Sequence, residues 1–254
     1  PFVFEIRDLW PELPKAMGVI RNPIVLAMLR FLEWLGYRSA TRLIGLAPGI
    51  VEGIRDGGAE GKMIAMIPNG CDIDLFGGSE PIGRRVFNDA HPLTAVFSGT
   101  HGVANGLDAV LDAAAVLKQQ NDNRVRFLLV GDGKEKRRLQ GVAKEKTLDN
   151  VEFLSPVDKE ELVKILRASD IGLQILSNIK EFYYGTSPNK FFDYLSVGLP
   201  VLTNYPGWIA DLVTEHGCGV VVPPEDPFAF AQTLQALVDL PDRLPIMGER
   251  AFQL

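Results

Sequence analysis

The amino-acid sequence predicts an α/β protein built on a doubly wound parallel sheet. From residue 94 to residue 222, short strands rich in Val, Leu, Ile and Phe alternate with amphipathic helical segments. In such an order each helix crosses over to the next strand, so the strands pair in parallel. The composition agrees, because 254 residues with 46% hydrophobic residues suffice for one large domain or two modest ones.

The N-terminal segment predicts a smaller set of elements. Residues 2–6 alternate and are rich in β-formers, which indicates a strand that ends before Arg7 and Asp8. A charged pair directly after a strand is where open α/β sheets place their chemistry. The elements predicted next are a helix over 24–35, a strand over 42–47, a helix over 50–55 and a strand over 62–68.

The predicted helix over 24–35 has two interpretations. Leu, Met and Phe occupy most of its faces, and Arg21, Arg30, Arg38 and Arg42 flank it. Such a helix can lie on an anionic membrane surface, or it can be a core helix of its domain. No run reaches the roughly 20 apolar residues that span a bilayer, and no signal peptide is recognised. Because the sequence begins at Pro1 with a strand under way, we expect a fragment whose upstream part is missing.

Residues 77–92 combine Gly, Ser, Pro and alternating charge, which is typical of an interdomain linker. We therefore expect a first domain over 1–76, a linker over 77–92, a second domain over 93–228 and a C-terminal helical segment over 229–254. The strands predicted in the second domain cover 95–97, 126–130, 151–154, 171–175, 200–203 and 219–222. The helices predicted there cover 106–117, 134–146, 159–167, 188–197, 207–215 and 228–237.

The helix after Ser187 has both ends marked. Ser187 suits the N-cap, Pro188 the first helical position, and Gly198 the left-handed residue that ends the helix. The free amides at such a start, with the helix dipole behind them, attract phosphate, and Lys190 adds a positive charge in the first turn. The alternative is an ordinary capped helix between two strands.

Three other strand–helix junctions have unusual content: residues 98–106, 131–134 and 155–158. The Gly131-Asp132-Gly133 turn suggests a dinucleotide fingerprint, with Glu152 as the ribose ligand. However, the third glycine of that fingerprint falls on Lys136, and the motif lies in the second strand unit rather than the first. A Walker P-loop and a nucleophile elbow are absent from the sequence.

Several function classes are disfavoured by composition. The net charge of -6 argues against broad nucleic-acid binding, which needs a positive field. The two cysteines, Cys71 and Cys218, fit a reducing compartment, and the three histidines do not form a metal-ligand spacing. We therefore expect no metal and no cofactor.

Seven segments together resemble the family-four retaining glycosyltransferases of the two-Rossmann-domain (GT-B) type, most closely the bacterial branch that transfers amino sugars in surface-polysaccharide synthesis. They are IRDLWPE (6–12), MIPNGCDIDLF (66–76), VFSGTHGVANGLDAVLDA (96–113), FLLVGDG (127–133), VEFLSPV (151–157), ASDIGL (168–173) and NKFFDYLSVGLPV (189–201). The resemblance implies two facing Rossmann-like domains, the N-terminal one incomplete here, with the acceptor on the first, the nucleotide sugar on the second and a final helix crossing back.

The sequence departs from this family at several positions. Thr100 and Asn105 stand where relatives usually have Arg and Lys beside the donor diphosphate. The two glutamates of a family motif map onto Gly185 and Asp193, so the first carboxylate is absent and the second is shortened. Lys190 is our candidate for the displaced positive charge, and Asp193 for the ribose ligand.

The resemblance implies a retaining, metal-independent glycosyltransferase. It would move a sugar, in our prediction an N-acetylated amino sugar from UDP, to a lipid-linked, lipopolysaccharide or capsule acceptor. The expected location is the cytoplasm or the inner face of the cytoplasmic membrane, and the fragment alone is expected to be inactive. A sugar-nucleotide epimerase or phosphorylase on the same fold, and a non-catalytic nucleotide-sugar-binding protein, stay open.

The candidate residues follow from the junctions and the resemblance. The candidate catalytic residues are Arg7, Asp8 and Lys190. The candidate donor-binding residues are Gly99, Thr100, Asn105, Gly131, Gly133, Pro156, Val157, Gly185, Thr186, Ser187, Asn189, Lys190 and Asp193.

Overall fold

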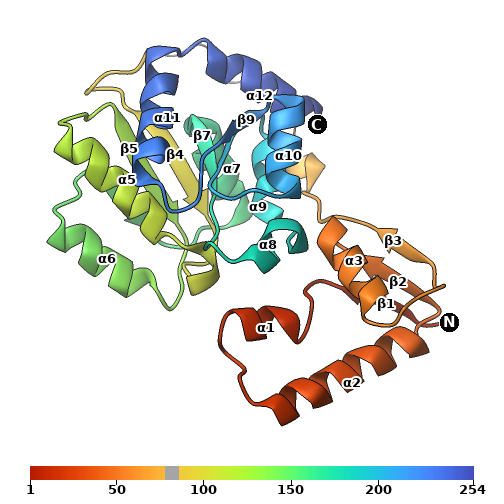
Figure 1. Ribbon diagram of the computed structural model, residues 1–254. Coiled ribbons are helices and arrows are strands. Elements are labelled where there is room, and N and C mark those ends of the chain that lie inside the picture. Colours follow the sequence, from red (N-terminus) through yellow and green to blue (C-terminus); the bar gives the residue numbers. More distant parts are fainter. Residues whose placement is uncertain (78–85) are drawn as a thin grey trace. The chain divides into compact units, whose positions relative to one another are not determined.

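The computed structural model of the chain describes residues 1–77 and 86–254 (Figure 1). Its contacts separate two compact units. Unit 1 comprises Pro1–Asn69 and Ile179–Pro188, and unit 2 comprises Gly70–Asn178 and Asn189–Leu254. These units divide the chain differently from the limits expected from the sequence, since unit 2 begins at Gly70 and the segment 179–188 returns to unit 1. Of the expected linker, residues 78–85 lie outside the described residues.

Unit 1 is a small parallel sheet with helices. Its strands are β1 (Val3–Ile6), β2 (Arg42–Gly45) and β3 (Ile64–Met66), in the order β1-β2-β3. Its helices are α1 (Glu12–Ala16), α2 (Pro23–Ser39), α3 (Pro48–Asp56) and α8 (Lys180–Gly185). All the strands and helices predicted over residues 2–68 are confirmed in type, whereas the short helices α1 and α8 were not predicted.

Helix α2 is longer than predicted because its start has a cap that the sequence analysis did not use. The Asn22 side chain accepts hydrogen bonds from the amides of Ile24 (2.9 Å) and Val25 (3.4 Å). Tyr37 is the buried residue of this helix, and its hydroxyl donates to Glu33 at 2.6 Å. The helix is therefore anchored to unit 1 mainly through its C-terminal half.

Unit 2 confirms the predicted doubly wound parallel sheet. Its strands are β4 (Leu93–Ser98), β5 (Val125–Val130), β6 (Val151–Leu154), β7 (Ile171–Gln174), β8 (Val201–Thr203) and β9 (Gly219–Val221). They lie in the order β6-β5-β4-β7-β8-β9, and all five pairings are parallel. The strand order therefore reverses between β4 and β7.

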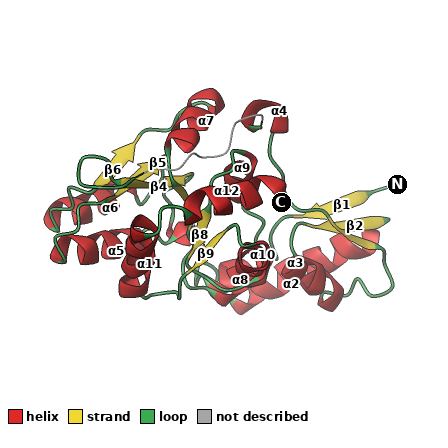
Figure 2. Cartoon of the chain, turned by 90° about the horizontal axis from the view of Figure 1, so that it is seen from above, coloured by secondary structure: helices red, strands yellow, loops and turns green. Residues whose placement is uncertain are grey.

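Helices cover both faces of this sheet. They are α4 (Ile73–Phe76), η1 (Val103–Asn105), α5 (Asp108–Gln119), α6 (Lys136–Glu145), α7 (Lys159–Ala168), α9 (Asn189–Ser196), α10 (Trp208–His216), α11 (Pro227–Asp239) and α12 (Arg243–Gln253). Figure 2 shows α5 and α11 on one face and α7, α9 and α12 on the other.

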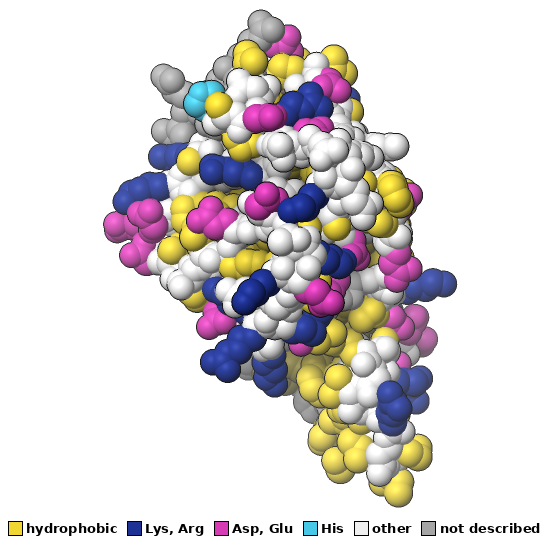
Figure 3. Space-filling view, turned by 90° about the vertical axis from the view of Figure 1, so that its left-hand side faces the viewer, with side chains coloured by type: hydrophobic (Ala, Val, Ile, Leu, Met, Phe, Trp, Pro, Cys, Tyr) yellow, Lys and Arg dark blue, Asp and Glu magenta, His cyan; other side chains and the backbone are white. Residues whose placement is uncertain are grey.

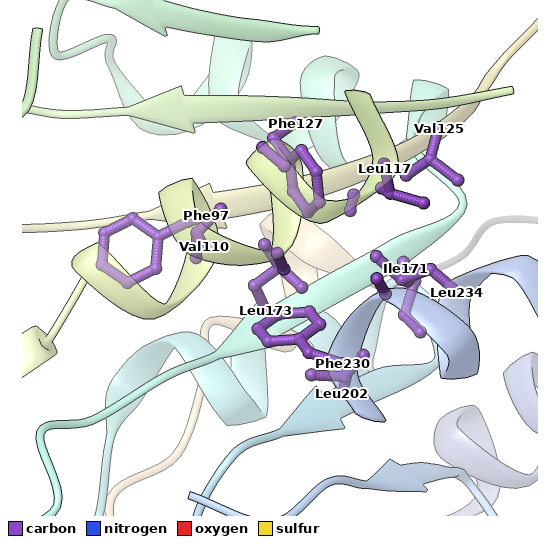
Figure 4. Close-up of a cluster of buried hydrophobic side chains, with 14 of the residues drawn as sticks. Phe97, Val110, Leu117, Val125, Phe127, Ile171, Leu173, Leu202, Phe230 and Leu234 are labelled. Atoms are coloured by element: carbon purple, nitrogen blue, oxygen red, sulfur yellow. The ribbon is translucent and has the colours of Figure 1, made fainter. Parts of the chain in front are cut away.

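Alternate residues of the central strands build the core on the α5 side. Leu93, Ala95 and Phe97 of β4 belong to it. Figure 4 shows Phe97 together with Val110 of α5 and Phe230 of α11. All five are at most 2% exposed. Burial on this scale, at about 25 cal/mol per Å² of apolar surface, makes β4 a rigid base for the loop that follows it.

The C-terminal segment is helical, as expected, and the crossing back of its final helix stays a prediction. Helix α11 packs on α5, and α12 packs on α9 and β9, so both belong to unit 2. Within the helical segment expected over 229–254, no separate helix was predicted at α12, because Pro245 and Gly248 obscure its helical pattern. Pro245 lies near the start of α12, where its missing amide hydrogen costs no helical hydrogen bond.

Candidate functional site

The reversal of strand order in unit 2 marks the place where ligands bind in open α/β sheets, outside the carboxyl ends of the strands. Two glycine loops meet there. Gly99, which follows β4, has φ +136°, and Gly131, which follows β5, has φ +140°. A Cβ atom on Gly131 would lie 1.9 Å from the carbonyl oxygen of Gly99. The two loops therefore pack backbone against backbone, which side chains at these positions would prevent.

Lys190, in the first turn of α9, reaches into this loop pair. Its Nζ donates a hydrogen bond to Asn105 Oδ1 at 2.9 Å, and Asn105 Nδ2 donates to the carbonyl of Thr100 at 2.7 Å. Nζ also lies 4.0 Å from the centroid of the Phe97 ring. A Cβ on Gly99 would lie 3.5 Å from Nζ. The structure thus brings together four predicted residues from two distant parts of the sequence.

The ammonium group of Lys190 is electrostatically unsatisfied. Burial lowers its pKa to about 7, and in residues 1–77 and 86–254 it forms no ion pair with a carboxylate. A half-buried cation whose polar partner is a neutral amide oxygen gains from a bound anion, which would favour its protonated form. This position is therefore suited to an anionic group.

A cavity of about 330 Å³ adjoins the same loops. Its lining consists of Ser98, Gly99, Thr100, Val130, Gly131, Asp132, Pro156, Val157 and Leu162. Five of these are predicted donor-binding residues: Gly99, Thr100, Gly131, Pro156 and Val157. Gly133 does not line it, and its amide donates to Asp132 Oδ1 at 2.8 Å. The cavity is thus built from the ends of β4, β5 and β6.

Two residues that the sequence analysis did not assign hold these loops. Lys136 Nζ donates to the carbonyls of Gly131 (2.6 Å) and Leu154 (2.7 Å), at the ends of β5 and β6. His101 is fully buried, and its backbone amide donates to the Asp132 carbonyl at 2.8 Å. Burial and the nearby Lys136 lower the pKa of His101. One feature of the sequence could have drawn attention to Lys136: it occupies the position of the third glycine of the dinucleotide fingerprint.

Helix α9 is tied to the end of β4. The Tyr194 hydroxyl accepts a hydrogen bond from the Ser98 amide at 3.0 Å, and its ring covers Gly172 of β7, where a Cβ would lie 2.5 Å from the ring. Asp193 precedes it, and burial raises the pKa of its carboxyl to about 6, against the attraction of Lys159. The helix begins at Asn189, and Gly198 (φ +68°) follows its end as predicted.

Five predicted site residues belong to unit 1. Arg7 and Asp8 follow β1, and partial burial raises the pKa of Asp8 while Arg7 opposes the shift. Gly185 ends α8, the Thr186 hydroxyl donates to the Phe182 carbonyl at 3.0 Å, and the Ser187 hydroxyl accepts from the Asn69 amide at 2.9 Å. The predicted set is therefore distributed over both units.

The part of the chain that the structure describes contains neither a cluster of metal-binding side chains nor a membrane-spanning helix. Within 1–77 and 86–254, no three His, Cys, Asp or Glu side chains come close enough to bind a metal ion together. No helix in the same ranges combines the length and the apolar character needed to cross a bilayer.

Comparison with known proteins identifies a family match. The family model described as "Glycosyl transferases group 1" matches residues 92–239, more than half of the 254-residue chain. The chain is 27% identical over 237 residues to the D-rhamnosyltransferase WbpZ of Pseudomonas aeruginosa, covering 92% of the chain and 59% of WbpZ. It is 28% identical to the D-inositol 3-phosphate glycosyltransferase 2 of Catenulispora acidiphila, covering 77% of the chain and 47% of that protein. The chain thus spans about half to three fifths of these relatives.

Solved structures share the fold. HepE of Anabaena, solved in complex with UDP-glucose, superposes with a TM-score of 0.76 at 18% identity, covering 100% of the chain and 66% of HepE. Sucrose-phosphate synthase of Thermosynechococcus elongatus gives a TM-score of 0.75 at 19% identity, covering 99% of the chain and 62% of the synthase. The chain therefore has the fold of part of a GT-B glycosyltransferase.

Proposed function

Because the chain belongs to the group 1 glycosyl transferases, we propose that the protein transfers a sugar from a nucleoside diphosphate donor, with retention at the anomeric carbon. The observation that supports this most is Lys190, a half-buried lysine whose ammonium group has no carboxylate partner in the described residues and lies where the strand order of unit 2 reverses. We infer that its missing partner is the donor diphosphate.

In the proposed reaction, an acceptor hydroxyl oxygen bonds to the anomeric carbon as the bond between that carbon and the diphosphate breaks. The hydroxyl proton passes to the leaving diphosphate, which gains negative charge as the bond breaks. The free amides at the start of α9 and the ammonium of Lys190 neutralise that charge. Asn105 holds the ammonium in place through its Oδ1 atom, 2.9 Å from Nζ. An interaction that strengthens as charge develops lowers the barrier, rather than only tightening binding. Thr186 and Ser187 hydroxyls are proposed to assist, and Arg7 and Asp8 to act near the transferred sugar.

We propose that the nucleoside of the donor binds in the cavity at the ends of β4, β5 and β6. The base would lie against Pro156 and Val157, and the ribose diol would donate to the Asp193 carboxylate. A backbone-lined cavity of about 330 Å³ is of a suitable size for a nucleobase and ribose. The glycines at 99 and 131 leave backbone atoms accessible to the ligand.

Our finer proposals concern the substrates. We propose UDP as the nucleotide, an N-acetylated amino sugar as the transferred group, a lipid-linked, lipopolysaccharide or capsule acceptor, and no metal or cofactor. The name of WbpZ gives D-rhamnose, not an amino sugar, as the group it transfers, so the amino sugar in our proposal rests on the sequence motifs. We also propose that this chain alone is inactive and that the intact protein acts at the inner face of the cytoplasmic membrane.

A thermal-shift screen of the intact protein with UDP, GDP, ADP and their sugars tests the donor. UDP should raise the melting temperature most, and a larger shift with GDP would replace UDP by GDP in the proposal. Transfer should then persist in EDTA and require an acceptor. Isomerised donor without acceptor would indicate an epimerase, and binding without any turnover would indicate a non-catalytic protein.

The membrane contact is proposed through α2. Ile24, Met28 and Phe31 of this helix are 79%, 56% and 58% exposed, and Leu32 and Leu35 extend the same apolar surface. Hydrophobic side chains gather in the lowest part of Figure 3, the level at which α2 lies in Figure 1. Apolar residues with arginines at the margins are typical of helices that lie on anionic lipid.

Sedimentation with liposomes tests this contact. The intact protein should pellet with vesicles that contain phosphatidylglycerol, and Phe31→Ser with Leu35→Ser should remain in the supernatant. If the wild-type protein does not pellet, the membrane proposal is wrong.

A further inference from the structure

Unit 1 contains a cavity of about 200 Å³ that no predicted donor contact explains, although Gly185 lies on its wall. Leu9 and Leu13 of the segment after β1 and Gly49 of α3 form its apolar part. Glu12, Lys180, Glu181 and Tyr184 supply its polar and aromatic side chains. Cavities with an apolar surface and a few convergent polar groups are the usual form of small-ligand sites.

The two carboxylates of this cavity differ in their surroundings. Glu12 is already paired, since its Oε1 accepts from Arg30 Nη2 at 2.9 Å. Glu181 is exposed and makes no hydrogen bond or ion pair in the parts of the chain that the structure describes. Glu181 is therefore the carboxylate that can accept hydrogen bonds from a ligand in this cavity without first breaking another contact.

Glu181 and Gly185 are related by one turn of α8. Residues four apart on a helix lie on the same side, and both residues line the cavity. A Cβ on Gly185 would meet no atom within 4 Å. The position at which the family motif leads one to expect a carboxylate thus has open space beside it, and a carboxylate from the preceding turn reaches the same cavity.

We propose that this cavity binds a sugar ring and that Glu181 accepts hydrogen bonds from its hydroxyl groups. The inference rests on the proposed function, since a glycosyltransferase handles a donor sugar and, in this proposal, a carbohydrate acceptor. A carboxylate accepts from two hydroxyls at once, and such charge-assisted bonds are stronger than neutral ones. The apolar side chains of Leu9 and Leu13 suit the C–H face of a sugar. Glu181 is thus a specificity-determining residue.

The test uses the intact protein with Glu181→Gln, which keeps the shape of the side chain and removes its charge. Glu52→Gln is the matched control, because Glu52 is an exposed residue of α3 with no hydrogen bond or ion pair in the described residues. The readouts are affinities for UDP and for UDP-N-acetylglucosamine by calorimetry, and the KM of the acceptor. The effect expected on the sugar-dependent readout is about tenfold or more, the usual loss for a hydrogen bond to a charged group.

The two sources of the sugar give different results. If the cavity binds the donor sugar, Glu181→Gln weakens UDP-N-acetylglucosamine binding and leaves UDP binding unchanged. If it binds the acceptor, the acceptor KM rises and both nucleotide affinities stay the same. In either case, adding Gly185→Glu to Glu181→Gln should restore part of the loss, which a merely structural role of Glu181 would not allow.

The proposal is overturned if Glu181→Gln behaves like Glu52→Gln in all three readouts, or if Gly185→Glu restores nothing. Failure of the wild-type protein to bind any nucleotide would instead contradict the proposed function, and this inference with it.

Discussion

Lys190 is the residue on which the account of the donor site depends. Its ammonium group lies between an aromatic ring, a glycine backbone and the amide oxygen of Asn105. Each of these partners is neutral, so the folded protein without ligand holds a charge that nothing compensates. Holding this uncompensated charge costs free energy, and the lowering of the Lys190 pKa to about 7 reflects this cost. Functional sites are where such uncompensated charges are retained.

The lowered pKa of Lys190 predicts that the affinity for UDP depends on pH. Diphosphate binds the protonated form of Lys190, so affinity should fall as pH rises above about 7, by up to tenfold per pH unit. Calorimetry at pH 8 in HEPES and in Tris should show proton uptake on binding, because the bound anion raises the Lys190 pKa. Lys190→Met should abolish both effects. An affinity of the wild-type protein that does not change between pH 6.5 and 9 would contradict this role.

Folding stability should respond to the same group. Burial lowers the Lys190 pKa to about 7 in the folded protein, from an ordinary value of 10.5 that the unfolded chain regains. Between these values the unfolded chain binds more protons, so stability should rise with pH from 7 towards 10.5. This contribution should disappear in Lys190→Met, which chemical denaturation at pH 7 and pH 9 would measure. An unchanged pH dependence in the variant would assign the effect to other groups.

Asp193 gives a third prediction at this scale. Asp193→Ala should weaken UDP binding by about 1–3 kcal/mol, because a ribose hydroxyl loses its charged acceptor. Pyrophosphate binding should not change, since it has no ribose. Calorimetry with both ligands separates the two groups. Equal UDP affinity in the variant and the wild-type protein would remove Asp193 from the ribose site.

At the scale of elements, the site depends on the contact between the loops after β4 and β5. Gly131→Ala places a Cβ 1.9 Å from the Gly99 carbonyl oxygen and occupies a positive φ. It should destabilise the protein by more than about 2 kcal/mol, since neither backbone can move away freely. Gly141→Ala is the control, because this glycine of α6 has open space around its Cβ and should stabilise by about 0.4–1 kcal/mol. Thermal unfolding of both variants measures this, and similar melting temperatures would show that the loops separate easily.

The elements also show what the sequence could predict. The strands of unit 2 were predictable because hydrophobic runs and helical periods alternate clearly from β4 to β9. Helices α4 and α12 were not, because α4 is a single turn and Pro245 interrupts the pattern of α12. Likewise, the proline and glycine signals at Pro188 and Gly198 predicted α9 to within one residue at each end, and Lys190 lies in its first turn. Its bond to Asn105 joins residues 85 positions apart, and no local pattern encodes such a contact.

At the scale of the whole molecule, the chain contains two compact units that share the predicted site residues. The expected domain limits followed composition, which marks residues 77–92 as a linker. The return of residues 179–188 to unit 1 depends on tertiary contacts such as the hydrogen bond from the Asn69 amide to Ser187. The domain roles, acceptor on the first and donor on the second, stay predictions. In our two proposals, sugar recognition by Glu181 belongs to unit 1 and diphosphate binding by Lys190 belongs to unit 2.

The central claim is that Lys190 supplies the positive charge that relatives place at the positions of Thr100 and Asn105. The most direct test is the turnover of Lys190→Ala in the intact enzyme at saturating donor, with Lys144→Ala of α6 as the control. We predict a loss of about 30-fold or more, equivalent to roughly 2 kcal/mol, in Lys190→Ala and none in the control. Unchanged turnover of Lys190→Ala would contradict the account.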